Sequence, residues 1–158
     1  MKRAITIIVL SLLCCNTSFG DNLIIMDGDT IKINGEKIRF AGIDAPESYY
    51  YGKKQVCYLD EIEVFCGKLS KEKLEEKIGT NPISCVKEEG KVSYDRFLGE
   101  CFVNGESLSK FMVRSGYAFD WPKYSKKKYA EDEEYAKTNK LGLWTMEFEY
   151  PWIWKKNK

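Results

Sequence analysis

Three acidic residues and one arginine lie close together near the start of the chain. Asp29 belongs to an Asp-Gly-Asp-Thr stretch at residues 27–30, and Asp44 and Glu47 belong to a second stretch that begins at Arg39. A short hairpin pattern separates the two stretches, so folding would bring them together. Carboxylate oxygens beside a guanidinium are the groups that metal-assisted phosphate chemistry needs.

The two aspartates are placed to hold a hard cation. Asp29 follows a strand turn and Asp44 follows a strand end, which would put both carboxylates at one rim. Two carboxylates, a nearby carbonyl and waters make an oxygen site that suits calcium, because calcium accepts irregular geometry. With two protein charges we expect weak affinity, on the order of 10⁻⁴–10⁻³ M. Glu47 follows Asp44 closely enough to hold a water beside the metal and accept its proton.

Two arginines complete the expected catalytic group. Arg39 lies beside the acids in the sequence, and Arg96 begins a strand much later in the chain. A phosphodiester gains negative charge as water attacks, and arginine meets that charge with a planar, bidentate donor set. A positioned arginine contributes roughly 10³–10⁵ in rate, and a general base about 10²–10⁴. Each acid alone could be a turn or cap residue, as we assign Asp27, so the ordered combination carries the prediction.

Composition narrows the chemistry further. The chain has no histidine, which excludes Ser-His-Asp hydrolysis, histidine-based nucleases and histidine metal sites. Its formal net charge is +1, and loss of Lys2 and Arg3 with a leader would leave about −1. Any affinity for nucleic acid must therefore come from local basic patches.

Residues 1–20 have the pattern of a secretory signal peptide. The basic pair Lys2-Arg3 precedes an apolar run, and the small residues Ser18 and Gly20 stand at −3 and −1 of a cut before Asp21. The run is too short to span a bilayer after cleavage. We therefore expect an exported protein, periplasmic or secreted, with no stable membrane association.

A surface lipoprotein is the alternative for this leader. Cys14 or Cys15 would carry the lipid, but the residue before each is a leucine or a cysteine and not a small residue. In both cases residues 21–158 are expected to form a single domain.

Four cysteines follow the leader, namely Cys57, Cys66, Cys85 and Cys101. An even number in an exported chain indicates disulfides. Cys85 and Cys101 lie at equal distances from Ser93, the midpoint of an expected hairpin, so we pair these two, and Cys57 with Cys66. A zinc site is the rival interpretation, but it needs paired short spacings that the chain lacks.

The elements that must position these residues are short. Alternating patterns predict strands over residues 23–26, 30–33, 38–41, 83–86 and 96–103, with an Asn34-Gly35 hairpin turn. Helices are expected over residues 69–78, from Ser107 to just before Gly116, and from Ser125 to about Lys140. Residues 48–66 are tyrosine-rich and are expected to have little regular structure. The pattern favours an α+β, mainly β fold, a small OB-like barrel rather than a doubly wound sheet.

These motifs together resemble the staphylococcal nuclease-like (thermonuclease) family over roughly residues 23–154. The matching stretches are Asp27-Gly28-Asp29-Thr30, Arg39 before Asp44-Ala45-Pro46-Glu47, Tyr94-Asp95-Arg96, Asn104-Gly105, Val113-Arg114-Ser115-Gly116-Tyr117-Ala118 and Leu141-Gly142-Leu143-Trp144. The cysteines and the Pro151-Trp152-Ile153-Trp154 ending resemble its exported, disulfide-bearing branch.

The resemblance implies a five-stranded OB-fold barrel with about three helices, and calcium-dependent cleavage of DNA and RNA. The implied roles are calcium ligation by Asp29, Asp44 and the backbone carbonyl of Ala45, water activation by Glu47, and phosphate binding by Arg39 and Arg96. Tyr94 matches a tyrosine near the bound nucleotide, but Ser93 stands where a lysine can occur. The tyrosine-rich stretch at residues 48–58 departs from the family pattern and has no assigned role.

We therefore expect a calcium-dependent hydrolase, an endonuclease that cleaves DNA and/or RNA as a monomer, with no protein partner indicated. The alternative is a catalytically silent OB-fold module that binds nucleic acid or protein. A pure binder, or a disulfide-stapled structural protein, has no need to keep the five-residue site together. The complete site therefore favours the enzyme.

Overall fold

The computed structural model describes residues 22–158, without the side chains of residues 91–93. The predicted signal peptide, residues 1–20, lies outside this range. In the described part, no helix combines the length and the apolar character needed to cross a bilayer.

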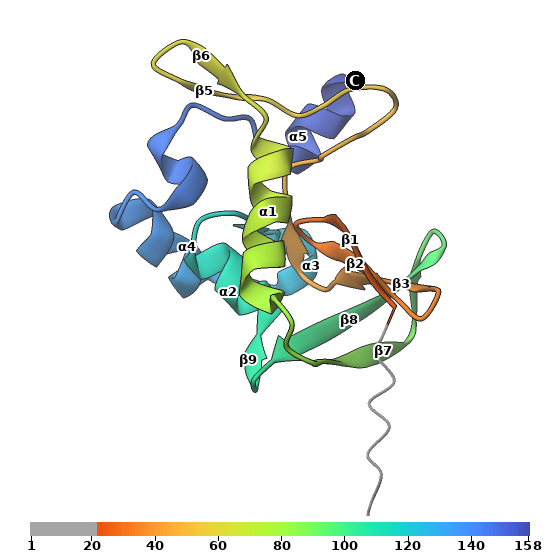
Figure 1. The fold of residues 1–158 in the computed structure, drawn as a ribbon. Coiled ribbons are helices and arrows are strands. Elements are labelled where there is room, and N and C mark those ends of the chain that lie inside the picture. Colours follow the sequence, from red (N-terminus) through yellow and green to blue (C-terminus); the bar gives the residue numbers. More distant parts are fainter. Residues whose placement is uncertain (1–21) are drawn as a thin grey trace, which may run out of the picture.

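A curved, mostly antiparallel sheet forms the lower right part of the fold in the view of Figure 1. Its strands are β1 (Leu23–Asp27), β2 (Thr30–Ile33), β3 (Glu36–Phe40), β7 (Ile83–Ser93), β8 (Arg96–Val103) and β9 (Glu106–Ser107), in the order β1-β2-β3-β8-β7 with β9 beside β8. The first three form the expected meander, and Asn34 and Gly35 take the positive φ angles that a two-residue hairpin turn requires. β3 pairs in parallel with β8, which joins the two halves of the sheet.

Helices cover one side and the upper end of this sheet (Figure 1). They are α1 (Cys66–Ile78), α2 (Leu108–Arg114), α3 (Pro122–Ser125), α4 (Ala130–Thr138) and α5 (Pro151–Trp154), with 3₁₀ turns η1 (Gly142–Thr145) and η2 (Lys155–Asn157). The mixed α+β, mainly β architecture agrees with the prediction. Three helices are longer than one turn, and Ser107 caps α2 by accepting a hydrogen bond from the N–H of Lys110 at 3.2 Å.

The expected single helix from Ser125 to about Lys140 was wrong. Ser125 ends α3, and Lys126 and Lys127 have φ angles of 54° and 67°, in the left-handed region. A helix cannot continue through such a pair, so α4 begins only at Ala130. The consequence is that two short helices replace one long one.

The prediction of an irregular segment over residues 48–66 was also wrong in part. The strands β5 (Cys57–Leu59) and β6 (Ile62–Val64) form a small hairpin there, with positive φ at Asp60 and Glu61 in its turn.

The structure contains the disulfides Cys57–Cys66 and Cys85–Cys101, the two pairs expected from the sequence. The first joins this hairpin to the start of α1.

Two apolar clusters hold the layers together. The larger lies between the sheet, α1 and α2, and it includes the buried side chains of Ile31, Phe40, Leu74, Leu108 and Met112. The smaller surrounds Phe119, Leu143 and the Cys57–Cys66 disulfide, and partly buried aromatic rings from residues 144–152 pack against it. This second cluster fixes the C-terminal segment against the rest of the fold.

Candidate active site

The first part of the site is a buried ion pair between neighbouring strands. Asp29 lies just before β2, and Arg39 on β3 is the register partner of Thr30. Nη1 of Arg39 donates to Oδ1 of Asp29 at 2.7 Å, and both residues are almost fully buried. The hairpin expected from the sequence therefore brings these two charges into contact.

Asp44 adds the second carboxylate. It belongs to β4 (Ile43–Asp44), which pairs with β10 (Phe119–Asp120), and it is completely buried. Nη2 of Arg39 donates to Oδ1 of Asp44, while the N–H of Ala45 donates to Oδ2 of Asp29 at 2.8 Å. Arg39 thus bridges both aspartates.

Burial and charge act against each other at this bridge. Burial raises the pKa of Asp44, although Arg39 and Lys155 oppose the shift. Burial also lowers the pKa of the Arg39 guanidinium, but Asp29 and Asp44 outweigh it, so the net shift is upward. Arg39 therefore remains charged.

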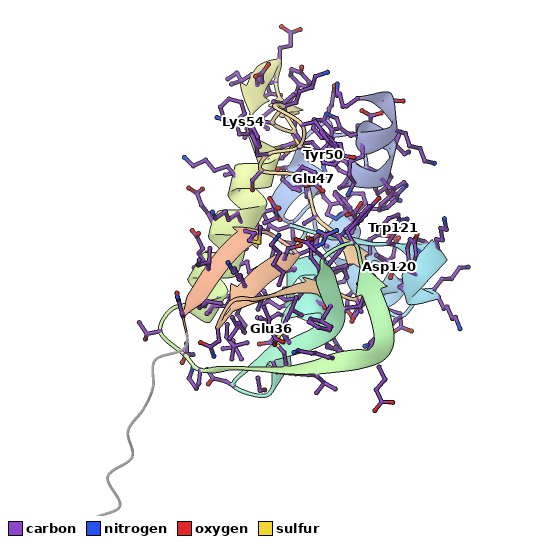
Figure 2. The ribbon with its side chains drawn as sticks, turned by 90° about the vertical axis from the view of Figure 1, so that its right-hand side faces the viewer. Glu36, Glu47, Tyr50, Lys54, Asp120 and Trp121 are labelled. Carbon is purple, nitrogen blue, oxygen red and sulfur yellow. A yellow bond between two sulfur atoms is a disulfide. The ribbon has the colours of Figure 1, made fainter. Side chains whose placement is uncertain are left out.

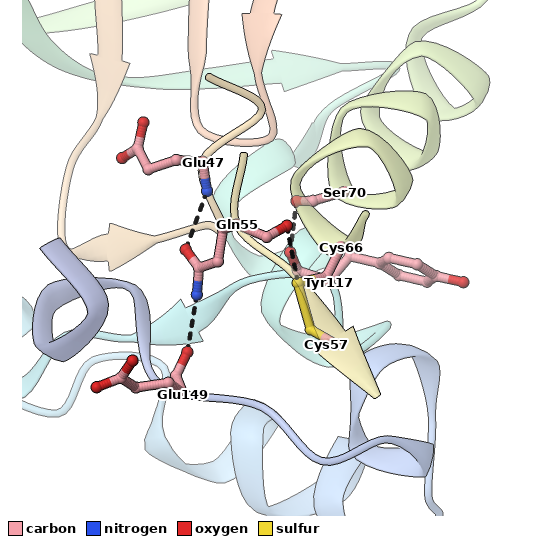
Figure 3. The surroundings of a disulfide bond; sticks show 7 residues. All are labelled: Glu47, Gln55, Cys57, Cys66, Ser70, Tyr117 and Glu149. Atoms are coloured by element: carbon pink, nitrogen blue, oxygen red, sulfur yellow. Dashed lines mark hydrogen bonds between the residues drawn. A yellow bond between two sulfur atoms is a disulfide. The ribbon is translucent and has the colours of Figure 1, made fainter. Parts of the chain in front are cut away.

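The backbone of Glu47 is held on both sides by Gln55. Its N–H donates to Oε1 of Gln55 at 3.2 Å and its carbonyl accepts from the N–H of Gln55 at 3.1 Å. The buried Gln55 in turn donates through Nε2 to the carbonyl of Glu149 at 2.8 Å (Figure 3). Nearby, a Cβ on Gly67 would lie 2.1 Å from the carbonyl oxygen of Glu47, so only glycine lets α1 approach this closely.

The Glu47 carboxyl has an unusual pKa for a glutamate. Burial raises this pKa to about 7, and the charge of Asp29 adds to the shift while Lys155 opposes it. A general base works best when its pKa lies near the working pH. Glu47 is therefore poised to take up and release a proton near neutrality.

Lys155 is a member of this cluster that sequence reasoning missed. Its Nζ lies 2.9 Å from Oδ1 of Asp44 and 2.9 Å from Oε1 of Glu47. Stacking of Trp152 between Trp121 and Tyr150, with ring centroids 5.9 and 4.6 Å apart, anchors the segment that carries it. No local pattern marks this lysine, since 108 residues separate it from Glu47.

Arg96 reaches the cluster through Thr30. Its Nη1 lies 3.5 Å from the Thr30 hydroxyl oxygen, and that hydroxyl donates to Oδ1 of Asp29 at 2.8 Å. The parallel pairing of β3 with β8 brings the two predicted arginines to the same region. Tyr94, by contrast, lies in the turn before β8 and is 93% exposed.

Asp27 and Thr30 have supporting positions. Oδ1 of Asp27 accepts from the N–H of Ser48 at 3.0 Å, which ties the turn to the segment after Glu47. Asp27 itself is the last residue of β1, directly before the turn at residues 28–29, and its exclusion from a metal site stays a prediction. Thr30 is part of the Asp-Gly-Asp-Thr motif identified in the sequence, whereas no sequence pattern predicted a role for Gln55.

The donor set suits a hard cation. Oδ2 of Asp44 is buried and accepts no hydrogen bond from any residue in the described part of the chain. Such an oxygen has a free lone pair for a metal, and carboxylate oxygens are the ligands that calcium prefers. Among residues 22–158, no three or more Asp, Glu, His or Cys side chains gather as a metal cluster.

The sequence is similar to those of known proteins. The family model described as staphylococcal nuclease homologue matches residues 37–146. The succinoglycan biosynthesis protein ExoI of Rhizobium meliloti is 34% identical over 80% of this chain and 64% of its own length. The endonuclease YhcR of Bacillus subtilis is 31% identical over 76% of this chain and 11% of its own.

A plant relative has a similar match. The staphylococcal-like nuclease CAN1 of Arabidopsis thaliana is 29% identical over 88% of this chain and 39% of its own length. The chain therefore spans less than two thirds of each of these three relatives. Since the family model covers most of the chain, this protein belongs to the staphylococcal nuclease homologue family.

Proposed function

We propose that this protein is an exported, calcium-dependent nuclease that hydrolyses phosphodiester bonds of DNA and/or RNA. The observation that carries the proposal is the arrangement around Arg39, which bridges Asp29 and Asp44 beside the carboxylate of Glu47. Two disulfides fit an oxidising compartment, in line with the leader expected at residues 1–20. YhcR and CAN1 are named as nucleases, whereas ExoI is named for succinoglycan biosynthesis.

In this mechanism Glu47 is the general base. With its pKa raised to about 7, the ionised carboxylate accepts a proton from the water that attacks phosphorus. The bond to the leaving oxygen then breaks as the new P–O bond forms. Because the site is largely buried, interactions between its charged groups are stronger than they would be in bulk water.

The two arginines would stabilise the charge that develops on the phosphate. A guanidinium has five N–H donors, so the contacts of Arg39 to the two aspartates leave others for a phosphate oxygen. Arg96 approaches from β8 and supplies a second donor set. Asp29, Asp44 and the carbonyl of Ala45 would hold calcium, which when bound polarises the phosphate and orients the attacking water.

Lys155 adds a condition to this mechanism. Its ammonium contacts the same two carboxylates that a cation and a water would need, so Lys155 must move aside or share Asp44 when the site is loaded. Lys155 would therefore act as a tethered cation that compensates the acids in the absence of a divalent cation.

One experiment tests the proposed function. The purified chain is incubated with heat-denatured DNA in calcium and in chelator, alongside Glu47→Gln, Arg96→Ala and, as a control, Glu61→Gln in the exposed β5–β6 turn. We expect cleavage in calcium alone, and a loss of about 10²–10⁴ for Glu47→Gln, the usual contribution of a general base. Equal cleavage in chelator, or Glu47→Gln as fast as the parent, would refute the mechanism. Binding without cleavage would identify a silent binding module.

A further inference from the structure

The tyrosine-rich segment after Glu47 forms one wall of an open groove. Tyr49, Lys53 and Lys54 line it from this segment, Glu63 and Phe65 line it from β6 and the start of α1, and Lys158 closes it from the C-terminal side. Its volume is about 460 Å³, within the roughly 300–1,000 Å³ of ligand sites. No role for this segment could be predicted from the sequence, and the mechanism above does not use it.

The groove is positively charged although the protein as a whole is nearly neutral. Its lining includes three lysines and one glutamate, whereas the whole chain has a formal net charge of only +1. Lys53 and Lys54 are both exposed. Since global charge cannot attract a polyanion here, a local patch of this kind is where phosphate groups would bind.

Exposed aromatic rings accompany the lysines. Tyr49 is 67% exposed and Phe65 is 44% exposed. Nζ of Lys54 lies 4.7 Å from the ring centroid of Phe65, and Nζ of Lys158 lies 5.4 Å from that of Trp154. Basic grooves with aromatic rings that stack on unpaired bases are the usual means of holding single-stranded nucleic acid.

The groove lies close to the candidate active site, because its walls include residues just after Glu47 and Trp154 just before Lys155. Tyr50 and Lys53 exchange backbone hydrogen bonds of 2.8 and 2.9 Å, which fixes the turn between Glu47 and Lys54. The Tyr50 ring lies 6.1 Å from that of Trp154, whose neighbour Lys155 contacts Glu47. Figure 2 shows Glu47, Tyr50 and Lys54 at the same end of the molecule.

We propose that this groove binds the single-stranded nucleic acid next to the bond that is cleaved. Lys53 and Lys54 contact its phosphates, and Tyr49 and Phe65 stack on its bases. A duplex would bind poorly, because its bases are already stacked on one another. This inference rests on the proposed function, and it makes the groove an extension of the substrate path.

The test compares a long and a short substrate in calcium. The long one is single-stranded oligothymidylate of about sixteen nucleotides, the upper site size of one OB-fold, and the short one is a dinucleotide that reaches only the candidate active site. For Lys53→Gln/Lys54→Gln we expect KM for the long substrate to rise roughly tenfold, and its salt dependence to weaken by about 0.7 in slope per lost phosphate contact. The kcat/KM for the dinucleotide should stay at the parent value.

Stacking is tested by Phe65→Ala. Loss of one base contact should weaken affinity for the long strand between about fivefold and a hundredfold, with little effect on a duplex of the same sequence. The control for Lys53→Gln/Lys54→Gln is Lys110→Gln/Lys140→Gln, which removes the same two charges from exposed positions on α2 and after α4. It should match the parent on both substrates.

The outcomes separate the two proposals. If the parent cleaves neither substrate, the proposed function fails. If the parent cleaves both and the groove variants equal the control, only the groove inference is overturned. Equal losses on the dinucleotide and the long strand would also overturn it, because the segment would then act only by positioning Glu47. Tighter binding of an acidic peptide than of the oligothymidylate would replace nucleic acid as the ligand.

Discussion

Lys155, near the C-terminal end of the chain, contacts Glu47, near its start. Its Nζ lies 2.9 Å from Oε1 of Glu47, although the two residues are 108 positions apart. The side chains are 19% and 13% exposed, so the pair is shielded from most solvent. The C-terminal segment is thereby tied to the charge balance of the candidate active site.

Lys155→Met should lower stability in the absence of calcium. Removing one partner of a buried ion pair leaves the other charge uncompensated, at a cost of about 3–5 kcal/mol. In millimolar calcium the loss should shrink, because a divalent cation can compensate Asp44 and Glu47 instead. Urea unfolding in calcium and in chelator measures both values.

The matched control is Lys156→Met, which removes the same charge from the next, exposed residue. Its effect should stay within about 0.5 kcal/mol under both conditions. A Lys155→Met variant with the same loss in calcium as in chelator would show that Lys155 and the cation do not share these carboxylates.

Arg96→Lys should reduce turnover while leaving KM nearly unchanged. Lysine keeps the charge but loses the planar, bidentate donor set that meets the developing charge on the phosphate. We expect kcat to fall by about 10³ or more, the scale reported for arginines that act in the transition state. The same change at Arg114, which pairs with Asp132 away from the site, should leave kcat intact. A parental kcat for Arg96→Lys would remove Arg96 from the catalytic group.

Glu133 should make stability decrease from acid toward neutral pH. Burial, aided by the charge of Asp120, raises its pKa from the usual 4.5 to about 7. Its protonated form therefore contributes stability that is complete below about pH 4.5 and is lost as the pH rises through about 7. Glu133→Gln should unfold at the same urea concentration as the parent in acid, and at a higher concentration above pH 7.

The control for this effect is Glu134→Gln, at the next and exposed position of α4. It should show no comparable pH-dependent difference from the parent. If the difference in stability between the parent and Glu133→Gln is the same at pH 8 as at pH 4.5, the raised pKa of Glu133 is contradicted.

Gly67→Ala should destabilise the protein although it replaces a helical glycine. In an open helix this change gains about 1 kcal/mol. Here the new Cβ would lie 2.1 Å from the backbone oxygen of Glu47, so the segment that carries the proposed base must shift. We expect both a lower unfolding midpoint and a lower kcat. Lys68→Ala, on the exposed side of the same turn of α1, is the control, and a more stable Gly67→Ala would show that the close approach is not required.

Local chemistry explains what could be predicted from the sequence. The Asn34-Gly35 turn, the Ser107 cap and the Cys85–Cys101 pair follow from neighbours in the chain or from hairpin register, which residue types reveal directly. The α+β class, the family and the identities of the acids and arginines follow from the same short patterns. Left-handed backbone at Lys126 and Lys127 does not, because lysine has no special preference for it, and so the break before α4 was missed.

The sequence by itself determined which charged groups are present and which of them lie at strand ends. Only the tertiary structure decided how those charges are compensated. The pairing of β3 with β8 brings Arg96 toward Asp29, and the packing of the C-terminal aromatic residues delivers Lys155 to Asp44 and Glu47. The physical reason is that burial and neighbouring charges set the pKa of a carboxyl group. Burial and neighbouring charges both depend on segments that are far apart in the chain.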